Sequence, residues 1–269
     1  MPPTDPELLL AGDLNLAESV RHLVREAPGG VIEEADGLLL VSNSSHFPGP
    51  WNNGAFRVDS RLAPADVLAR AGEFFGRLGR AYCLWLRDHA PEDVDLAAAA
   101  KDAGLVDLGI SSPQMVLDAP LAASGALDAD ITVDHVDNER ARAAYVDVTA
   151  AAYEALGQPP QVAHEVLARL PALHGPNVRA VVARVDGEPA AAAMLTVSHC
   201  LGCVGLVGTV PHHRRRGLAE LVTRRVGNAA FALGAWSAVL QASPMGEPLY
   251  QRMGYREVTR YRFLLGSPG

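Results

Sequence analysis

Residues 209–222 read TVPHHRRRGLAELV. An apolar, β-branched segment ends at Pro211, and two histidines and three arginines follow before Gly217. An apolar stripe at helical spacing then begins at Leu218. Three like charges at the start of a helix cost stability, because the backbone there already carries partial positive charge. Since free amides at a helix start bind anions, the pattern predicts a turn that holds an anionic ligand.

The residue types in this turn suit a pyrophosphate. Gly217 has no Cβ, so a phosphate can approach its backbone closely. Arg214, Arg215 and Arg216 can add charge-assisted hydrogen bonds to phosphate oxygens. The charge distribution agrees, because residues 129–269 carry a small excess of basic side chains whereas residues 1–128 are strongly acidic. Neither the P-loop nor the dinucleotide-binding pattern occurs in the chain.

Helical and strand patterns surround this turn. In the second half they predict strands at 131–136, 203–210, 236–242 and 258–265, helices at 138–156, 162–170, 218–233 and 246–254, and a hairpin turning at Asp186-Gly187. In the first half they predict helices at 14–25, 64–79 and 95–104, strands at 55–59, 81–88 and 112–118, and a hairpin turning at Asp36-Gly37.

The same order of elements occurs in both halves. The two Asp-Gly turns are 150 residues apart, and other matched elements keep nearly that spacing. Such a regular offset predicts a tandem repeat of one fold. The sequence thus divides into one copy over 1–120, a linker of small residues over 121–129 and a second copy over 130–269.

Two motifs carry a resemblance to a known family. The segment RRRGLA at 214–219 fits the pattern Arg/Gln-x-x-Gly-x-Gly/Ala, and LYQRMGY at 249–255 follows about thirty residues later. Together they resemble the pyrophosphate-binding motif and the LYxxxGF segment of the GCN5-related N-acetyltransferases. The resemblance covers residues 130–265, whereas residues 1–120 resemble the same fold only in the order of their elements.

The resemblance implies an α/β (α+β) fold that is present twice. Each copy would be a mixed, mostly antiparallel sheet with splayed central strands, flanked by helices. Acetyl-CoA is the implied co-substrate, and its pantetheine arm would pair with backbone groups in the wedge between strands 203–210 and 236–242. The residues expected to bind it are Gly208, Thr209, Val210, Arg214, Arg215, Arg216, Gly217, Leu218, Ala219 and Ser243. Ser243 has a second interpretation, as a serine that serves its own turn.

The implied chemistry is attack of an amine on a thioester. By resemblance Tyr250 is the acid that protonates the departing thiolate, and the helix start and the arginines nearby are expected to lower its pKa. The alternative is that Tyr250 only packs beneath its short helix. The general base stays open among water, His199, Glu165 and Asp134, because strand 203–210 carries no carboxylate.

The acceptor is expected to be a small-molecule amine or a peptide amine. Tyr153, Gln158 and Pro160 are predicted to line its site. An acetyl-CoA-dependent N-acetyltransferase is the preferred hypothesis. The two alternatives are a non-catalytic acyl-CoA-binding or sensor protein and a scaffold whose repeat serves assembly. Retention of Tyr250 and of the arginine-glycine turn argues against both. A monomer and a homodimer both stay open.

The first half lacks the binding turn. Pro64 and Asp66 stand where the arginines and the glycine would be needed, and a carboxylate there would repel a pyrophosphate. The first copy is therefore interpreted as degenerate. Its loop 44–54, which contains Phe47 and Trp51, either caps an acceptor pocket or packs beneath itself.

Composition excludes several other classes of function. The net charge of −8 and the absence of a basic helix face argue against nucleic-acid binding. No run of 18 apolar residues occurs, so no membrane span is predicted. The start of the chain does not fit a signal peptide, and three cysteines cannot form a disulfide framework, so a reducing cytoplasm is expected.

Two short motifs suggest metal or redox chemistry. Cys200 and Cys203 form a lone CxxC, for which neighbouring positions across a tight strand turn are the simpler interpretation. His212 and His213 can ligate a metal, or they can form a cationic approach to the binding turn. The reaction implied by the resemblance needs no metal, so none is predicted.

Overall fold

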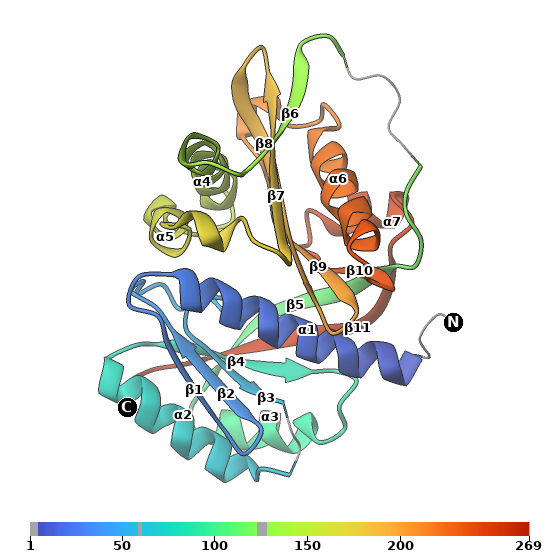
Figure 1. The fold of residues 1–269 in the computed structure, drawn as a ribbon. Coiled ribbons are helices and arrows are strands. Elements are labelled where there is room, and N and C mark those ends of the chain that lie inside the picture. The colour runs from blue at the N-terminus through green and yellow to red at the C-terminus, as the bar shows by residue number, and fades with distance from the viewer. Residues whose placement is uncertain (1–4, 59–60, 123–127, 269) are drawn as a thin grey trace.

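A computed structural model describes residues 5–58, 61–122 and 128–268 of the chain (Figure 1). The linker predicted over 121–129 lies mostly outside these ranges. Leu121, the first residue of this predicted linker, is held by Asn228. The side chain of Asn228 accepts from the backbone amide of Leu121 at 2.8 Å and donates to its carbonyl at 2.9 Å. None of the helices in the described ranges combines the length and the apolarity needed to cross a membrane.

The described residues of the first half form three helices and five strands. Their bounds are α1 Asp5–Glu26, β1 Val31–Ala35, β2 Leu38–Ser42, β3 Gly54–Arg57, α2 Pro64–Leu78, β4 Tyr82–Arg87, α3 Asp93–Asp102 and β5 Val106–Leu117. Helix α1 begins nine residues before its predicted start, since its first turns bury Leu8 against Val116, Leu201 and Val239. Periodicity alone could not reveal that contact, because its partners are remote in sequence.

In the second half, the part that the structure describes forms four helices, six strands and two single 3₁₀ turns. Their bounds are β6 Ile131–His135, α4 Glu139–Glu154, α5 Pro160–Val166, η1 Leu170–Ala172, β7 Val178–Val185, β8 Glu188–Ser198, β9 Leu201–Thr209, η2 Pro211–His213, α6 Leu218–Ala232, β10 Ser237–Gln241, α7 Glu247–Arg252 and β11 Arg256–Gly266. Helix α4 begins at the predicted position because the side chain of Asn138 caps it, accepting from the amide of Ala141 at 3.0 Å.

Both predicted Asp-Gly hairpins are confirmed. The register pairs Ala35 with Leu38 and Val185 with Glu188, which leaves two-residue turns. The turn residues have positive φ, 51° and 80° in the first turn and 49° and 81° in the second. Two consecutive left-handed residues match the right-handed twist of the strands, which explains the Asp-Gly pairs.

All strands in the described residues belong to one sheet, in the order β1-β2-β3-β4-β11-β5-β10-β9-β8-β7-β6. The last strands of the two halves are exchanged. Strand β5 ends the first half but lies against β10, whereas β11 ends the second half but lies against β4. The exchanged strands also pair with each other in antiparallel orientation, so the two halves share one continuous backbone ladder.

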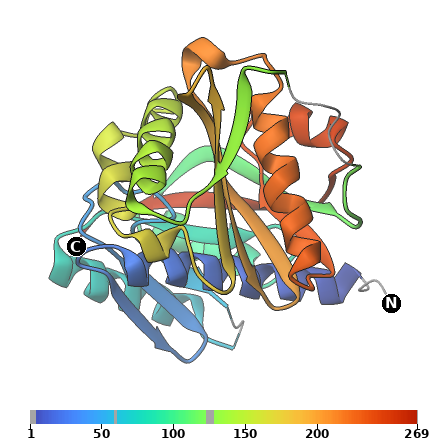
Figure 2. The same cartoon turned by 45° about the horizontal axis from the view of Figure 1, so that its top comes forward.

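Helices cover both faces of the second half, with α4 and α6 on opposite sides of β7–β9 (Figures 1 and 2). Successive residues of a strand point to opposite faces. Along β8, Ala191, Ala193 and Leu195 therefore pack in the core beneath α6. Their neighbours Ala192 and Met194 pack in the core beneath α4. The near-continuous apolar run of β8 follows from burial on both sides.

Helix α1 joins the two halves. Its inner face packs on β2 and β3, while α2 and α3 cover the other side of these strands. Asn15 is fully buried, and its side-chain amide nitrogen Nδ2 donates to the carbonyl of Ser198 at 3.0 Å and to that of Leu201 at 3.1 Å. Asn15 thereby fixes α1 to the end of the β8–β9 hairpin.

Candidate functional site

Strands β9 and β10 diverge, as the resemblance to the GCN5-related N-acetyltransferases implies. They pair in parallel at three positions, ending at Cys203 and Val239, although β9 continues to Thr209. A register shift against β8 and a positive φ of 47° at Leu206 mark a β-bulge just beyond this point. The hydroxyl of Tyr145 donates to the carbonyl of Leu206 at 3.2 Å and helps to hold the bulge.

The backbone groups that face the wedge differ in part from the prediction. The amide of Val210 donates to the carbonyl of Ala190 at 2.9 Å, so it points toward β8. The assignment of Val210 to a bound pantetheine is corrected accordingly. Because backbone groups alternate sides along a strand, Thr209 faces the wedge instead, and the Nε of Arg214 donates to its carbonyl at 3.3 Å.

Gly208 is required by packing rather than by a ligand. A Cβ at this position would lie 2.7 Å from the Cβ of Ala152 on α4. Real Cβ atoms do not approach each other this closely, so a larger residue would push α4 away from β9. Gly208 therefore allows α4 to form one wall of the wedge.

The arginine-rich turn has the geometry of an anion site. Arg215 and Gly217 have positive φ values of 63° and 75°, whereas Arg216 between them does not have a positive φ. No side chain among the described residues caps the start of α6, so the first amides of this helix are left for a ligand. Within the same described ranges, no atom lies within 4 Å of a Cβ placed on Gly217, and the space beside it opens into a cleft. Successive amides of this kind form concave sites for phosphate oxygens.

This cleft, called here the turn cleft, has a volume of about 520 Å³. Among the predicted residues, it is lined by Gly208, Thr209, Arg214, Arg215, Gly217, Leu218, Ala219, Ser243, Tyr250 and Tyr153. Arg216 does not line it, because its guanidinium donates to Asp130 at 3.0 Å. Arg252 of α7 does line it, a cation for which the sequence motifs gave no signal.

A second cavity, called here the inner cavity, has a volume of about 250 Å³ and is built by both halves of the chain. The first half contributes Trp51, Trp85 and the middle of β5 around Ser111 and Ser112. No Asp, Glu, His, Lys or Arg is among the described residues that line it. The loop that carries Trp51 therefore reaches this cavity, one of the two alternatives that the sequence left open.

Five residues line both spaces and form the passage between them: Tyr153, Leu156, Val207, Ser243 and Tyr250. The hydroxyl of Ser243 accepts from the amide of Gly246 at 3.2 Å, so it serves its own turn and keeps its proton for a further bond. Gly246 is needed beneath the ring of Tyr250, since an added Cβ would lie 2.8 Å from a ring carbon.

Tyr250 does not have the lowered pKa that the sequence suggested. The side chain is almost completely buried, and this desolvation raises its pKa to about 12, while the Thr223 hydroxyl opposes the shift. The prediction is wrong because the arginines act across a solvent-accessible cleft, whereas burial penalises the phenolate directly. The phenol therefore stays protonated throughout the neutral range.

The other predicted acceptor and base residues lie away from both spaces. Gln158 and Pro160 line neither the turn cleft nor the inner cavity, and neither do the candidate bases His199 and Glu165. Asp134 is held by Arg184, whose Nε donates to it at 2.7 Å. Tyr153 is thus the one predicted acceptor residue that reaches the passage.

The CxxC segment forms a tight turn between β8 and β9. The register pairs Ser198 with Leu201, leaving His199 and Cys200 as turn residues with positive φ. Burial raises the pKa of Cys203 to about 11, so its thiol stays protonated at neutral pH. A protonated thiol is a poor nucleophile and a poor redox partner.

The matching region of the first half is closed. Helix α2 begins after Ala63 with Pro64 in its first turn and Asp66 nearby. The cavity between β3, β4 and α1 measures only about 20 Å³. Arg87 lines it, and its guanidinium pairs with Asp13 at 3.3 Å and with Asp93 at 2.9 Å.

Comparison with solved structures identifies the architecture. A GCN5-related N-acetyltransferase from Kribbella flavida superposes with a TM-score of 0.69 at 24% sequence identity, covering 94% of this chain and 95% of that one. The fold is that of the GCN5-related N-acetyltransferases. A tandem GNAT protein from the clavulanic acid biosynthesis pathway superposes with a TM-score of 0.61 at 15% identity, covering 100% of this chain and 98% of its own.

A third N-acetyltransferase of this fold, from Sphaerobacter thermophilus, matches 88% of the chain and 82% of its own length, with a TM-score of 0.61 and 17% identity. No family model and no curated protein matches the sequence. The GNAT fold is thus established by structure at identities where the sequence shows little similarity.

Proposed function

We propose that this protein is an acetyl-CoA-dependent N-acetyltransferase whose active site lies in residues 130–269. The observation that carries the proposal is the position of Tyr250, at the passage between an anion-ready cleft and an inner cavity with no charged side chain among its described lining residues. One space suits a pyrophosphate and the other an acceptor, and a transfer reaction requires the two to meet.

The turn cleft fits acetyl-CoA on its own features. The uncapped start of α6 and the left-handed Gly217 offer amides to the pyrophosphate, with Arg214 and Arg215 beside them. The unpaired edge of β9 around Thr209 offers backbone groups to the pantetheine amides. Bound in this way, acetyl-CoA would supply an activated acyl group as a thioester.

The inner cavity favours an acceptor that enters without charge. Its walls hold aromatic rings, aliphatic side chains and hydroxyl groups but no charged side chain among the described residues. Burying an unpaired charge there would be costly. The amine therefore loses its proton to water before it enters, which accounts for the lack of a general base in the walls.

The residues that remain act on the leaving group. As the nitrogen–carbon bond forms and the carbon–sulfur bond breaks, negative charge collects on sulfur and the new ammonium must shed a proton. The phenol of Tyr250 is protonated and lines the passage, so it can donate a hydrogen bond to the sulfur. The proton from the nitrogen neutralises the thiolate, either through Tyr250 or through water.

We further propose that residues 1–120 are a degenerate copy that serves structure and completes the acceptor pocket. The closed 20 Å³ cavity and the Arg87 ion pairs support this interpretation, as does the contribution of Trp51 and Trp85 to the inner cavity. One acetyl-CoA site per chain is the expected stoichiometry.

Calorimetry with acetyl-CoA tests the proposal. We expect one site per chain in the wild type and loss of binding in Gly217→Glu, which places a carboxylate in the turn. Gly234→Glu is the matched control, because Gly234 also has a positive φ of 87° and no atom within 4 Å of an added Cβ. Equal affinity in Gly217→Glu and Gly234→Glu would remove the site assignment.

A panel of amines, followed by release of the CoA thiol, then separates an enzyme from a sensor. Turnover with an amine that carries no second charge supports the transferase. Tight acetyl-CoA binding without turnover across charged and uncharged amines would instead favour an acyl-CoA sensor.

A further inference from the structure

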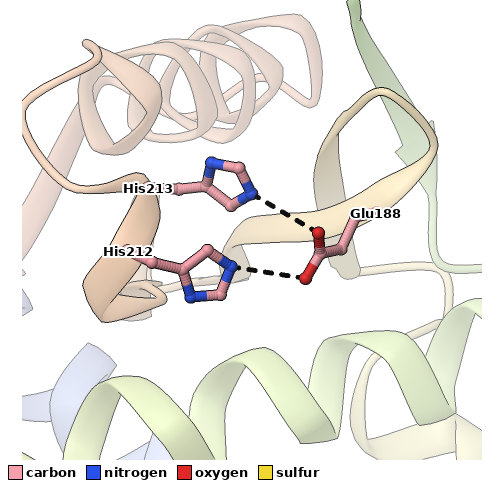
Figure 3. A group of neighbouring side chains, drawn as sticks. All are labelled: Glu188, His212 and His213. Atoms are coloured by element: carbon pink, nitrogen blue, oxygen red, sulfur yellow. Dashed lines mark hydrogen bonds and ion pairs between the residues drawn. The ribbon is translucent and has the colours of Figure 1, made fainter.

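A cluster of three potential metal ligands lies beside the arginine turn but outside both cavities (Figure 3). The Nε2 of His212 is 3.3 Å from one carboxylate oxygen of Glu188, and the Nε2 of His213 is 3.8 Å from the other. All three ligand atoms lie within 4.8 Å of one another, the only such group of three or more in the described part of the chain.

The backbone brings these residues together. Glu188 is the first residue of β8 after the Asp-Gly turn, and the two histidines form η2 directly after β9. Strands β8 and β9 are antiparallel neighbours, so the start of one lies beside the end of the other. The single turn of η2 begins with Pro211, whose fixed φ restricts the positions of both rings.

One ligand atom of the cluster, the Nε2 of His213, makes no hydrogen bond to the described residues. The side chain of His213 is only 13% exposed, and its Nε2 is buried. The gap of 3.8 Å to Glu188 is too long for a hydrogen bond. In Figure 3 this nitrogen points at the carboxylate, so an ion placed between them would satisfy both groups.

The nearby arginines do not fill the space. Arg214 donates toward the carbonyls of Thr209 and Ala152, and Arg215 lines the turn cleft. Arg216 binds Asp130 through one nitrogen and contacts the Nδ1 of His213 at 3.3 Å through the other. Its charge is therefore paired on the far side of the imidazole ring from Glu188.

We propose that Glu188, His212 and His213 bind one divalent transition-metal ion of the zinc class. Two imidazole nitrogens and a carboxylate, with a fourth position left for water, are a recurrent zinc ligand set. Bonds of about 2.0–2.2 Å in tetrahedral geometry separate ligand atoms by about 3.3–3.6 Å. The three ligand atoms here lie within 4.8 Å of one another, and the exposed side chains of Glu188 and His212 are free to close that difference around an ion. The site lies outside the transfer reaction proposed above and does not depend on it.

Metal binding changes one contact in a defined way. A guanidinium can only donate, so the Nδ1 of His213 accepts from Arg216, and the neutral ring carries its proton on Nε2. Coordination through Nε2 requires the proton on Nδ1 instead. The ion therefore displaces Arg216 from the ring and leaves it with Asp130.

The test is zinc titration of the untagged, full-length protein by calorimetry, with Co²⁺ and its visible absorption as a second probe. We expect one Zn²⁺ per chain and a loss of affinity of at least about tenfold in His213→Gln and in Glu188→Gln. Glu188 is exposed, so that variant keeps the test valid if His213→Gln folds poorly. The matched controls are His199→Gln and Cys200→Ser, two other potential ligands in the β8–β9 turn, and both should bind as the wild type does.

Three results would overturn the proposal. The first is the absence of saturable Zn²⁺ uptake by the wild type. The second is unchanged affinity in both Glu188→Gln and His213→Gln. The third is loss of binding in Cys200→Ser, which would assign the ion to the β8–β9 turn.

Discussion

Replacing Tyr250 by phenylalanine removes one hydroxyl group from a residue that lines both spaces. The ring should stay in place, because it packs over Gly246 and contacts the ring of Tyr255, with a centroid separation of 5.9 Å. Any change in rate then reports on the hydroxyl. We expect kcat to fall while the affinity for acetyl-CoA stays nearly unchanged.

The size of the loss follows from the pKa of the phenol. That pKa is raised to about 12 by burial, against about 8.5 for an ordinary thiol. Complete proton transfer from Tyr250 to a thiolate would be uphill by roughly 3.5 pK units, or about 5 kcal/mol. The hydroxyl should therefore act mainly as a hydrogen-bond donor to the departing sulfur.

A hydrogen bond to a charged group contributes about 1.5–3 kcal/mol, which corresponds to a loss of about 10- to 150-fold in kcat. This is less than the loss of about 10²–10⁴-fold that full general-acid catalysis would give. The ratio of the two rates should be constant from pH 6 to 10, because the phenol stays protonated throughout. Both rates should rise with pH as the free amine loses its proton.

The assay measures CoA-thiol release at saturating acetyl-CoA with an amine from the panel, and Tyr255→Phe is the matched control. Tyr255 is also buried and lines neither space, so its variant should keep the wild-type kcat. A Tyr250→Phe enzyme within about threefold of wild type at every pH would make Tyr250 a packing residue. If the wild-type rate falls on the alkaline side below pH 10 and this fall is absent in Tyr250→Phe, the raised pKa of Tyr250 is refuted.

Two further predictions follow from the inner cavity and from the buried tyrosines. Trp51→Ala should raise the KM for the amine and leave the Kd for acetyl-CoA unchanged, because Trp51 lines the inner cavity. The control Trp236→Ala, at a half-exposed position, should alter neither constant. If steady-state kinetics give the two variants the same KM for the amine, Trp51 is excluded from the acceptor site. The pKa of all six tyrosines is raised in the folded protein. Above pH about 10, the unfolded chain therefore loses its phenolic protons while the folded protein keeps them. The free energy of unfolding should fall as the pH rises toward 12. Tyr250 alone should contribute about 2–3 kcal/mol to that fall, and a urea midpoint that stays constant between pH 9 and 11 would contradict the prediction.

Local backbone chemistry was the part of the fold most open to sequence analysis. The two Asp-Gly hairpins depend on a few neighbouring residues, and both occur where the sequence predicts them. The anion turn is similar, since its glycine, its cations and its helix start are consecutive in the chain. Such features need no knowledge of distant contacts.

The features that escaped prediction depend on distant packing. Arg216 is turned away by Asp130, which is 86 residues earlier in the chain. The pKa of Tyr250 is set by how deeply the fold buries it, not by the cations next to it in sequence. Trp85 and Ser112 reach the inner cavity because of where their strands lie in the sheet, and no motif marks either residue.

The exchange of the last strands explains why a half without its own binding turn remains part of the site. Strand β5 lies between β10 and β11, and its middle residues Ser111 and Ser112 line the inner cavity. Strand β11 in turn pairs with β4, which carries Trp85. Each half therefore completes the sheet of the other, and the first half can lose its cleft but not its strands. Burial of Arg87 and Asp13 in the closed half and opening of the cleft in the other are thus two outcomes of one repeated fold.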